Sequence, residues 1–374
     1  MESRDALKPL TSLRFAAALL VFSWHCVPTR QISATFSLGY AGVSFFFLLS
    51  GFILTYGYHR VFAGGVELGA VRTFYAARIA RVYPLHLITL LLMVLCLPYL
   101  GENSVWTGVE ASRRLGEIAA GALLIQSWFP DRVIHFGSNG PAWSISVEAF
   151  FYALFPVLAF ALLRLFRTSS PRIVLVVAGA LWLAATLVLA PQHAGSDDWR
   201  FYVFPPARLV EFVVGMLLGI AFLRRDPAAA WPLRATSVEM LAIAAAALAI
   251  YASPLFPRSL QFSAGVMPAW AFLISVFAWR RGAISRFLEH PVLVRLGEVS
   301  YAFYLVHLAV IMLFAHTLGW GSPLAAPLML SVTLALSFAL YHGIEQPLRR
   351  RIRTRFAPGP PARVHAAIPA ASAP

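Results

Sequence analysis

The chain has 374 residues, of which 59% are hydrophobic and only 12% are charged, and its mean hydropathy is +0.73. This composition excludes a soluble domain, which would need more polar residues to cover its surface, and it indicates an integral membrane protein. The net charge of +14 does not indicate nucleic acid as a partner, because membrane proteins concentrate arginines in their cytoplasmic loops.

Eleven apolar runs follow one another along the chain. They fall near residues 12–29, 38–59, 79–100, 116–129, 145–163, 173–191, 204–223, 237–254, 261–279, 299–318 and 324–344. Most approach the roughly 20 residues with which a helix crosses a bilayer, and none alternates as barrel strands do. We therefore predict an all-α fold, a polytopic bundle of transmembrane helices surrounded by membrane lipids.

Arginine clusters between the runs set the predicted orientation. They follow the second, fifth, seventh, ninth and last runs. All five clusters can be cytoplasmic only if the weak run at 116–129 is a re-entrant or interfacial segment. This predicts ten spans with both termini in the cytoplasm. A membrane domain is expected over residues 1–350, and a disordered tail rich in Pro and Ala over residues 351–374.

The first run, LRFAAALLVFSWH at residues 13–25, contains an arginine and a histidine. Arg14 and His25 are eleven residues apart, which places them within about 20° on one helix face and about 16 Å apart along the axis. Ionisable residues at membrane depth indicate a functional site. The alternatives are that Arg14 reaches the interface and that His25 makes a structural hydrogen bond.

The second and third runs add further candidates. In GVSFFFLLSGFIL, residues 42–54, Gly51 favours close helix packing, and Ser50 is a candidate for lining a pocket. In FYAARIARVYPLH, residues 74–86, Arg78 and Arg81 share one helix face, followed by Tyr83. Two guanidinium groups there suit an anionic ligand approaching from the cytoplasm, whereas positive-inside bias is the simpler explanation for one of them.

Two later segments carry buried polar groups. In GSNGPAWSISVEAFFY, residues 137–152, Trp143 and Ser146 precede Glu148, a carboxylate that enters the membrane one turn into a helix. The alternative for Glu148 is a first-turn acid that favours the helix N-terminus. In GEVSYAFYLVH, residues 297–307, Tyr304 and His307 lie one turn apart, and hydrogen bonding between helices is the simpler use of both.

Other patterns do not predict chemistry. Cys26 and Cys96 lie inside apolar runs without metal-type spacing, so no metal site is expected. His193 and Asp198 match the H-x4-D pattern of soluble glycerolipid acyltransferases, but two residues match often by chance. That loop is also expected on the outer side, where a cytosolic acyl donor cannot reach it.

Several motifs occur together in the order seen in membrane acyltransferase family 3. They are LTSLRFAAALLVFSWH, GVSFFFLLSGFIL, FYAARIARVYPLH, PAWSISVEAFFYALFP, SYAFYLVH and EQPLRRR. The chain resembles that family over about residues 8–350. The family includes O-antigen and peptidoglycan O-acetylases, acylases of exopolysaccharides and Nod factors, and macrolide acyltransferases. The resemblance implies an integral membrane O-acyltransferase that moves an acyl group, usually acetyl, from acyl-CoA to a carbohydrate hydroxyl.

The resemblance also implies roles for particular residues. Arg14 and His25 match the R-x10-H element, whose histidine is held to be essential. Arg78 and Arg81 match an arginine pair implicated in holding the donor. Trp143, Ser144, Ser146 and Glu148 match the W-S-x-S-x-E element. In this scheme His25 acts as general base and Glu148 orients its imidazole or an acceptor hydroxyl, and a covalent acyl-histidine is the alternative.

The family resemblance and the composition also predict partners and a location. The resemblance implies acyl-CoA, most simply acetyl-CoA, as a co-substrate, and no permanently bound cofactor is expected. The chain lacks the C-terminal SGNH domain of some members, so it is expected to act alone or with a separate periplasmic transferase. The preference for Arg over Lys suggests a GC-rich bacterial genome, and the bacterial inner membrane is the expected location. A proton-coupled transporter or exporter of a glycan or small molecule remains the alternative.

Overall fold

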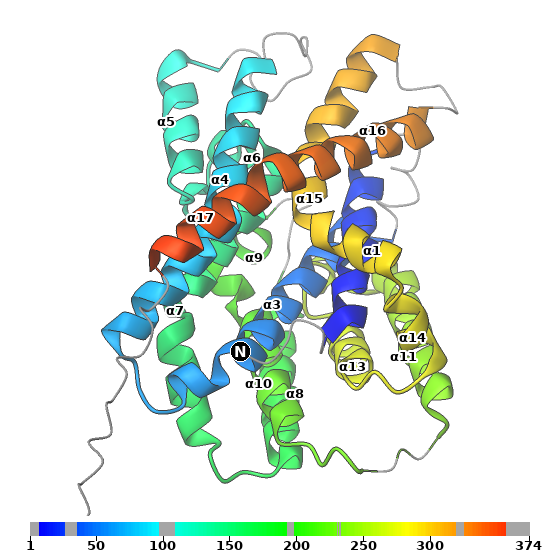
Figure 1. Ribbon diagram of the computed structural model, residues 1–374. Helices are drawn as coiled ribbons and strands as arrows, with labels where there is room; N and C mark the ends of the chain where they lie inside the picture. The colour runs from blue at the N-terminus through cyan, green and yellow to red at the C-terminus, as the bar shows by residue number, and fades with distance from the viewer. Residues whose placement is uncertain are drawn as a thin grey trace, which may run out of the picture.

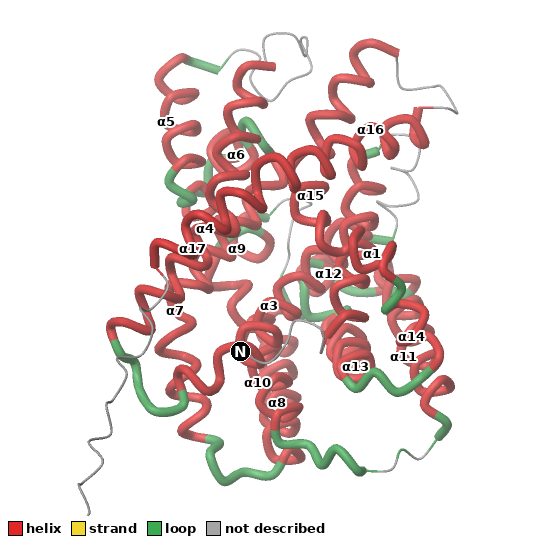
Figure 2. Tube along the Cα trace, in the orientation of Figure 1, coloured by secondary structure: helices red, strands yellow, loops and turns green. Residues whose placement is uncertain are grey.

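The computed structural model describes residues 7–26, 36–96, 109–192, 198–229, 231, 233–318 and 325–356 (Figure 1). Within these ranges every element is helical and no strand occurs (Figure 2). The predicted all-α fold is therefore confirmed. His193 and the tail from residue 357 onward lie outside the described residues.

The helices follow the apolar runs. In chain order they are α1 (Lys8–His25), α3 (Leu38–Phe62), α4 (Leu68–Cys96), α5 (Ala111–Ala122), η3 (Gln126–Trp128), α6 (Arg132–Phe136), η4 (Gly140–Ala142), α7 (Trp143–Leu165), α8 (Pro171–Leu189), α9 (Trp199–Tyr202), α10 (Pro205–Leu223), α11 (Ala235–Tyr251), η5 (Ser253–Leu255), α12 (Arg258–Gln261), α13 (Met267–Ala278), α14 (Ala283–Leu288), α15 (Pro291–Leu318), α16 (Ala325–Leu340), η6 (Tyr341–Glu345) and α17 (Gln346–Phe356).

Seven helical segments in the described part are long and apolar enough to cross a membrane. They are Leu38–Phe62, Leu68–Cys96, Gly140–Leu165, Pro171–Leu189, Trp199–Leu223, Pro291–Phe314 and Ala325–Ile352. Helices α11 and α13 are apolar but shorter, and α1 contains Lys8 and Arg14. These three helices cover the remaining predicted spans, so the count of ten stays a prediction.

Close backbone contacts hold the centre of the bundle together. A Cβ atom on Gly51 of α3 would lie 2.0 Å from the carbonyl oxygen of Phe212, and one on Gly215 of α10 would lie 2.0 Å from that of Leu48. Only glycine allows two helices to approach so closely. The predicted packing role of Gly51 is therefore confirmed.

Helix α1 is held between α3 and α15. A Cβ on Gly297 of α15 would lie 1.9 Å from the carbonyl oxygen of Thr11, and one on Gly42 of α3 would lie 2.7 Å from that of Ala17. Gly39 contacts Trp24, so α3 runs antiparallel to α1. The helix that carries Arg14 and His25 is thus positioned by two neighbouring helices.

The weak apolar run at 116–129 does not form one continuous helix. Helix α5 ends at Ala122, and Leu124 has a positive φ of 58°. Twelve residues are too few to cross a bilayer. In Figure 1, α5 stands beside α4 at one end of the bundle. The hydroxyl of Tyr83 donates to the carbonyl oxygen of Ala122 at 2.9 Å, which ties the two helices together.

The last helices follow one another without a break. Helix α16 passes through a π-helical turn, η6, into α17, which contains the C-terminal arginines. Helix α17 crosses in front of α4 and packs against it (Figure 1). This arrangement brings Glu345 in η6 near the arginines of α4.

Candidate functional site

Three arginines and a carboxylate meet between α1, α4 and α7, and we call them the arginine cluster: Arg14, Arg78, Arg81 and Glu148. Arg14 interacts electrostatically with Arg81 and Glu148, and Arg81 interacts with Glu148 and with Glu345. The four side chains are half-buried. The structure thus brings the two predicted arginine motifs and Glu148 to one place.

Arg14 and Arg81 differ from ordinary structural arginines. Neither side chain donates a hydrogen bond to any residue in the described part of the chain. A guanidinium offers five donors, and burying such donors without acceptors is costly. By contrast, the fully buried Arg208 donates to Glu211 and to two backbone carbonyl oxygens. The cluster can therefore accept an anion that supplies the missing acceptors.

Arg78 is held by aromatic rings. Its guanidinium carbon lies 5.7 Å from the ring centre of Tyr58 and 5.8 Å from those of Phe74 and Tyr152. Its Nε is buried without a hydrogen-bond partner. Cation–π contacts of this kind orient an arginine, and the Nη2 of Arg78 also donates to the hydroxyl of Tyr58 at 3.5 Å.

Glu148 makes two hydrogen bonds. The hydroxyl of Ser50 donates to its Oε1 at 3.0 Å, and the hydroxyl of Tyr152 donates to the same oxygen. Tyr152 is a member of this site that the sequence analysis missed, although its position four residues after Glu148 places it on the same helix face. Neither bond involves His25, so the structure does not support the expectation that Glu148 orients that imidazole.

A second part of the site consists of two histidines, His25 and His307, which we call the histidine pair. Nε2 of His307 lies 3.1 Å from Nδ1 of His25. The Nδ1 of His25 also lies 3.0 Å from the carbonyl oxygen of Val21. His307 is only 1% exposed, whereas His25 is half-buried. The pair joins α1 to α15 and leaves the His25 ring more accessible than that of His307.

Polar groups on α7 and α15 connect the arginine cluster with the histidine pair. Ser144, Glu148 and Tyr152 recur every four residues, so they follow one face of α7 at intervals of about 6 Å. The hydroxyl of Tyr304 lies 2.7 Å from that of Ser144, interacts electrostatically with Glu148 and precedes His307 by one turn. Together these residues form a row of polar side chains between the arginine cluster and the histidine pair.

Three other predicted residues have structural partners. Ser146 donates to the carbonyl oxygen of Leu124 at 2.7 Å, and Trp143 packs against Tyr202 with ring centres 4.6 Å apart. Tyr83 is bonded to α5 as described above. These contacts fix the segment that enters α7, and they do not bring the three side chains to the histidine pair.

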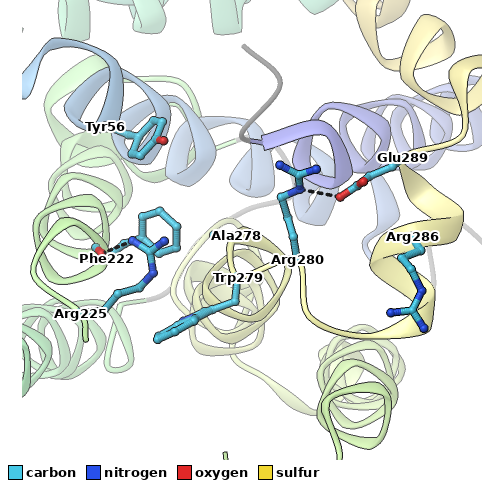
Figure 3. A pocket seen from close by; sticks show the side chains of 8 residues that line it. All are labelled: Tyr56, Phe222, Arg225, Ala278, Trp279, Arg280, Arg286 and Glu289. Carbon is cyan, nitrogen blue, oxygen red and sulfur yellow. Dashed lines mark hydrogen bonds and ion pairs between the residues drawn. The ribbon is translucent and has the colours of Figure 1, made fainter. Parts of the chain in front are cut away.

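Two cavities lie apart from these residues. One, of about 420 Å³, opens at the ends of α3, α10 and α13 (Figure 3) and is lined by Tyr56, Phe222, Arg225, Ala278, Trp279, Arg280, Arg286 and Glu289. The other, of about 450 Å³, is lined by Arg295, Glu298, Val299, Phe338, Tyr341 and His342. None of the predicted site residues lines either cavity. No group of three or more His, Cys, Asp or Glu side chains that could hold a metal occurs among the described residues.

Residues 9–342 match the family model for the acyltransferase domain of acyltransferase family 3. The chain is 32% identical to acyltransferase MdmB of Streptomyces mycarofaciens over 93% of each chain. It is 29% identical to the exopolysaccharide production protein ExoZ of Rhizobium meliloti, over 86% of this chain and 92% of ExoZ.

A third relative is longer than this chain. The putative peptidoglycan O-acetyltransferase YrhL of Bacillus subtilis is 24% identical over 91% of this chain but only 54% of its own length. The chain therefore spans about half of that protein. No solved structure matches it.

Proposed function

The chain belongs to acyltransferase family 3 and is an O-acyltransferase, and we propose that it transfers an acyl group, most simply acetyl, from acyl-CoA to a carbohydrate hydroxyl. The names of YrhL and ExoZ support an acceptor that is a cell-surface polysaccharide or a glycosylated precursor. Membrane lipids surround the protein. A separate periplasmic transferase is a further proposed partner.

The observation that carries the proposal is the arginine cluster. Arg14 and Arg81 are half-buried and donate no hydrogen bond within the described residues, and Arg78 has a buried Nε without a partner. The phosphates of CoA would supply acceptors for these guanidinium groups, which bind phosphate through pairs of N–H donors. The thioester would then extend toward His25 beside the row of polar side chains on α7 and α15.

His25 is proposed as the general base. It takes the proton from the acceptor hydroxyl as the hydroxyl oxygen attacks the thioester carbonyl carbon. The C–S bond then breaks, CoA leaves as a thiolate, and the imidazolium returns the proton to that sulfur. The new C–O bond completes the ester. Base catalysis of this kind accounts for about 10² to 10⁴ in rate.

Glu148 is proposed to act on the arginine cluster and not on the imidazole. Its carboxylate accepts from Ser50 and Tyr152 and lies among Arg14 and Arg81. It offsets part of their charge while the site is empty of anions and holds their side chains in place. Tyr304 and Ser144 are proposed to line the passage between the two ends of the site.

The proposed topology gives each substrate its own side of the membrane. With ten spans and both termini in the cytoplasm of a bacterial inner membrane, the start of α1 faces the cytoplasm. Arg14 is then nearer the cytoplasm, where acyl-CoA is made, and His25 is nearer the outer side. An acceptor sugar would reach His25 from outside, and the acyl group would cross most of the membrane while attached to CoA.

Binding of acetyl-CoA to the purified protein tests the donor site. Replacing Arg81 with Ala is expected to weaken the affinity by about 10- to 100-fold, because it removes charged hydrogen bonds to phosphate. Isothermal titration calorimetry in detergent measures the change. Arg72→Ala is the control, since Arg72 is exposed on the same helix. Equal affinities of both variants and the wild type would contradict the proposed donor site.

A further inference from the structure

The histidine pair has a hydrogen-bond geometry that determines which nitrogen of each ring carries hydrogen. Nδ1 of His307 lies 2.6 Å from the carbonyl oxygen of Tyr304. A carbonyl oxygen can only accept, so Nδ1 of His307 carries the hydrogen and donates it. In the neutral ring Nε2 of His307 then has the lone pair and is an acceptor.

This assignment fixes the tautomer of His25. Its Nδ1 faces two acceptors, Nε2 of His307 at 3.1 Å and the carbonyl oxygen of Val21 at 3.0 Å. Only a hydrogen on Nδ1 satisfies either of them, and it is shared between the two. The lone pair of neutral His25 is therefore on Nε2, the other nitrogen of the ring.

His307 is itself held firmly. Its ring stacks on Phe303 at an interplanar angle of 11° with ring centres 6.4 Å apart, and it is almost fully buried. Tyr304, the titratable neighbour on the same helix, is anchored by bonds to Ser144 and to the carbonyl oxygen of Pro141. A buried ring with a fixed donor contact cannot rotate freely, so its Nε2 keeps a constant direction toward α1.

We propose that His307 is a positioning residue that holds His25 in the Nδ1–H tautomer and presents Nε2 as the basic atom. The proposal rests on the proposed role of His25 as base. His307 would act as the orienting partner does in a catalytic triad, but as a neutral acceptor in place of a carboxylate. When His25 takes up a proton on Nε2, its Nδ1–H stays bonded to His307 and Val21, which stabilises the imidazolium.

Two variants of His307 test this role. His307→Leu removes the acceptor, whereas His307→Gln keeps an amide oxygen at a similar distance from the backbone. We expect His307→Leu to lower kcat about tenfold, the effect of one hydrogen bond, with an unchanged affinity for acetyl-CoA. The acidic limb of its pH–rate profile should move to lower pH, because the imidazolium of His25 loses a partner. His307→Gln should recover most of kcat.

Several outcomes would overturn the proposal. Wild-type kcat in His307→Leu would do so, as would equal losses in the Leu and Gln variants when both are folded. If His307→Leu does not fold, ¹⁵N NMR of the histidines in the wild-type protein decides: hydrogen on Nδ1 of His25 is expected, and hydrogen on Nε2 would contradict it. Activity in His25→Ala would instead refute the proposed function, so the two failures are distinguishable.

Discussion

At the scale of single residues, the protein uses buried charge in two different ways. Arg208 and Glu211 are fully buried and paired with each other, and Arg208 also donates to two backbone carbonyl oxygens. Arg14 and Arg81 are partly accessible and lack such bonds within the described residues. Arg208, Arg14 and Arg81 all lie among apolar helices, and only the presence or absence of acceptors separates a structural arginine from a ligand-binding one.

Glu117 in α5 allows a pH prediction. Its carboxylate accepts from the backbone N–H of Ser138 at 2.6 Å and from the Ser138 hydroxyl at 2.9 Å. Burial raises the pKa of Glu117, and these bonds offset part of the rise. A carboxyl whose pKa is raised in the folded state stabilises the fold below its ordinary pKa of about 4.3. That stabilisation is lost as pH rises through the folded pKa.

Glu117→Gln should remove this dependence, because an amide does not titrate. Between about pH 4 and pH 7, the range above the ordinary carboxyl pKa, thermal unfolding of the wild type should show a fall in stability that the variant lacks. Glu110→Gln is the control, since Glu110 is exposed at the start of the same helix. The same pH slope in Glu117→Gln and the wild type would contradict the argument.

At the scale of elements, contact between α3 and α10 positions one wall of the site. Ser50, which bonds Glu148, directly precedes Gly51, whose place allows α10 to approach. On the other side of α3, Gly42 lies against α1. The arginine cluster and the histidine pair therefore depend on packing distances that glycine makes possible, and not only on the residues that line them.

Gly51→Ala tests this dependence. The added methyl group would meet the backbone oxygen of Phe212 at 2.0 Å, so the helices must separate, at a cost of about 1 to 3 kcal/mol or more. Gly57→Ala on the same helix meets nothing within 4 Å and should leave stability unchanged or improve it, since alanine favours helix. Melting temperatures in detergent measure both. Equal melting temperatures of the two variants would contradict close packing of α3 and α10.

At the scale of the whole molecule, the sequence predicted which segments form helices better than it predicted which helices contact one another. Helical spacing predicted that Arg14 shares a helix face with His25 and that Arg78 shares one with Arg81, because the period of a helix depends on local geometry alone. Charge and hydropathy likewise predicted a helical membrane protein. The break at Leu124 was not predicted, since its positive φ has no signal in an apolar run.

Contacts between helices could not be deduced in the same way. Periodicity shows which residues share a face but not which helix that face meets. Sequence analysis therefore expected Glu148 to orient either His25 or an acceptor hydroxyl, and it did not pair His25 with His307, which lies 282 residues away in the chain. The interactions of Glu345 and Tyr152 with Arg81 were not predicted for the same reason. Their positions depend on the packing of α7 and η6 against α4.

The central claim is that acyl-CoA, bound through its phosphates at the arginine cluster, gives up its acyl group at His25. The measurement that tests it most directly compares wild type and His25→Ala in membrane vesicles that contain the host glycans, following labelled acetate from acetyl-CoA into carbohydrate. We expect the variant to bind acetyl-CoA with wild-type affinity and to lose transfer by at least about 10²-fold. Transfer at the wild-type rate by a folded His25→Ala protein would contradict the account.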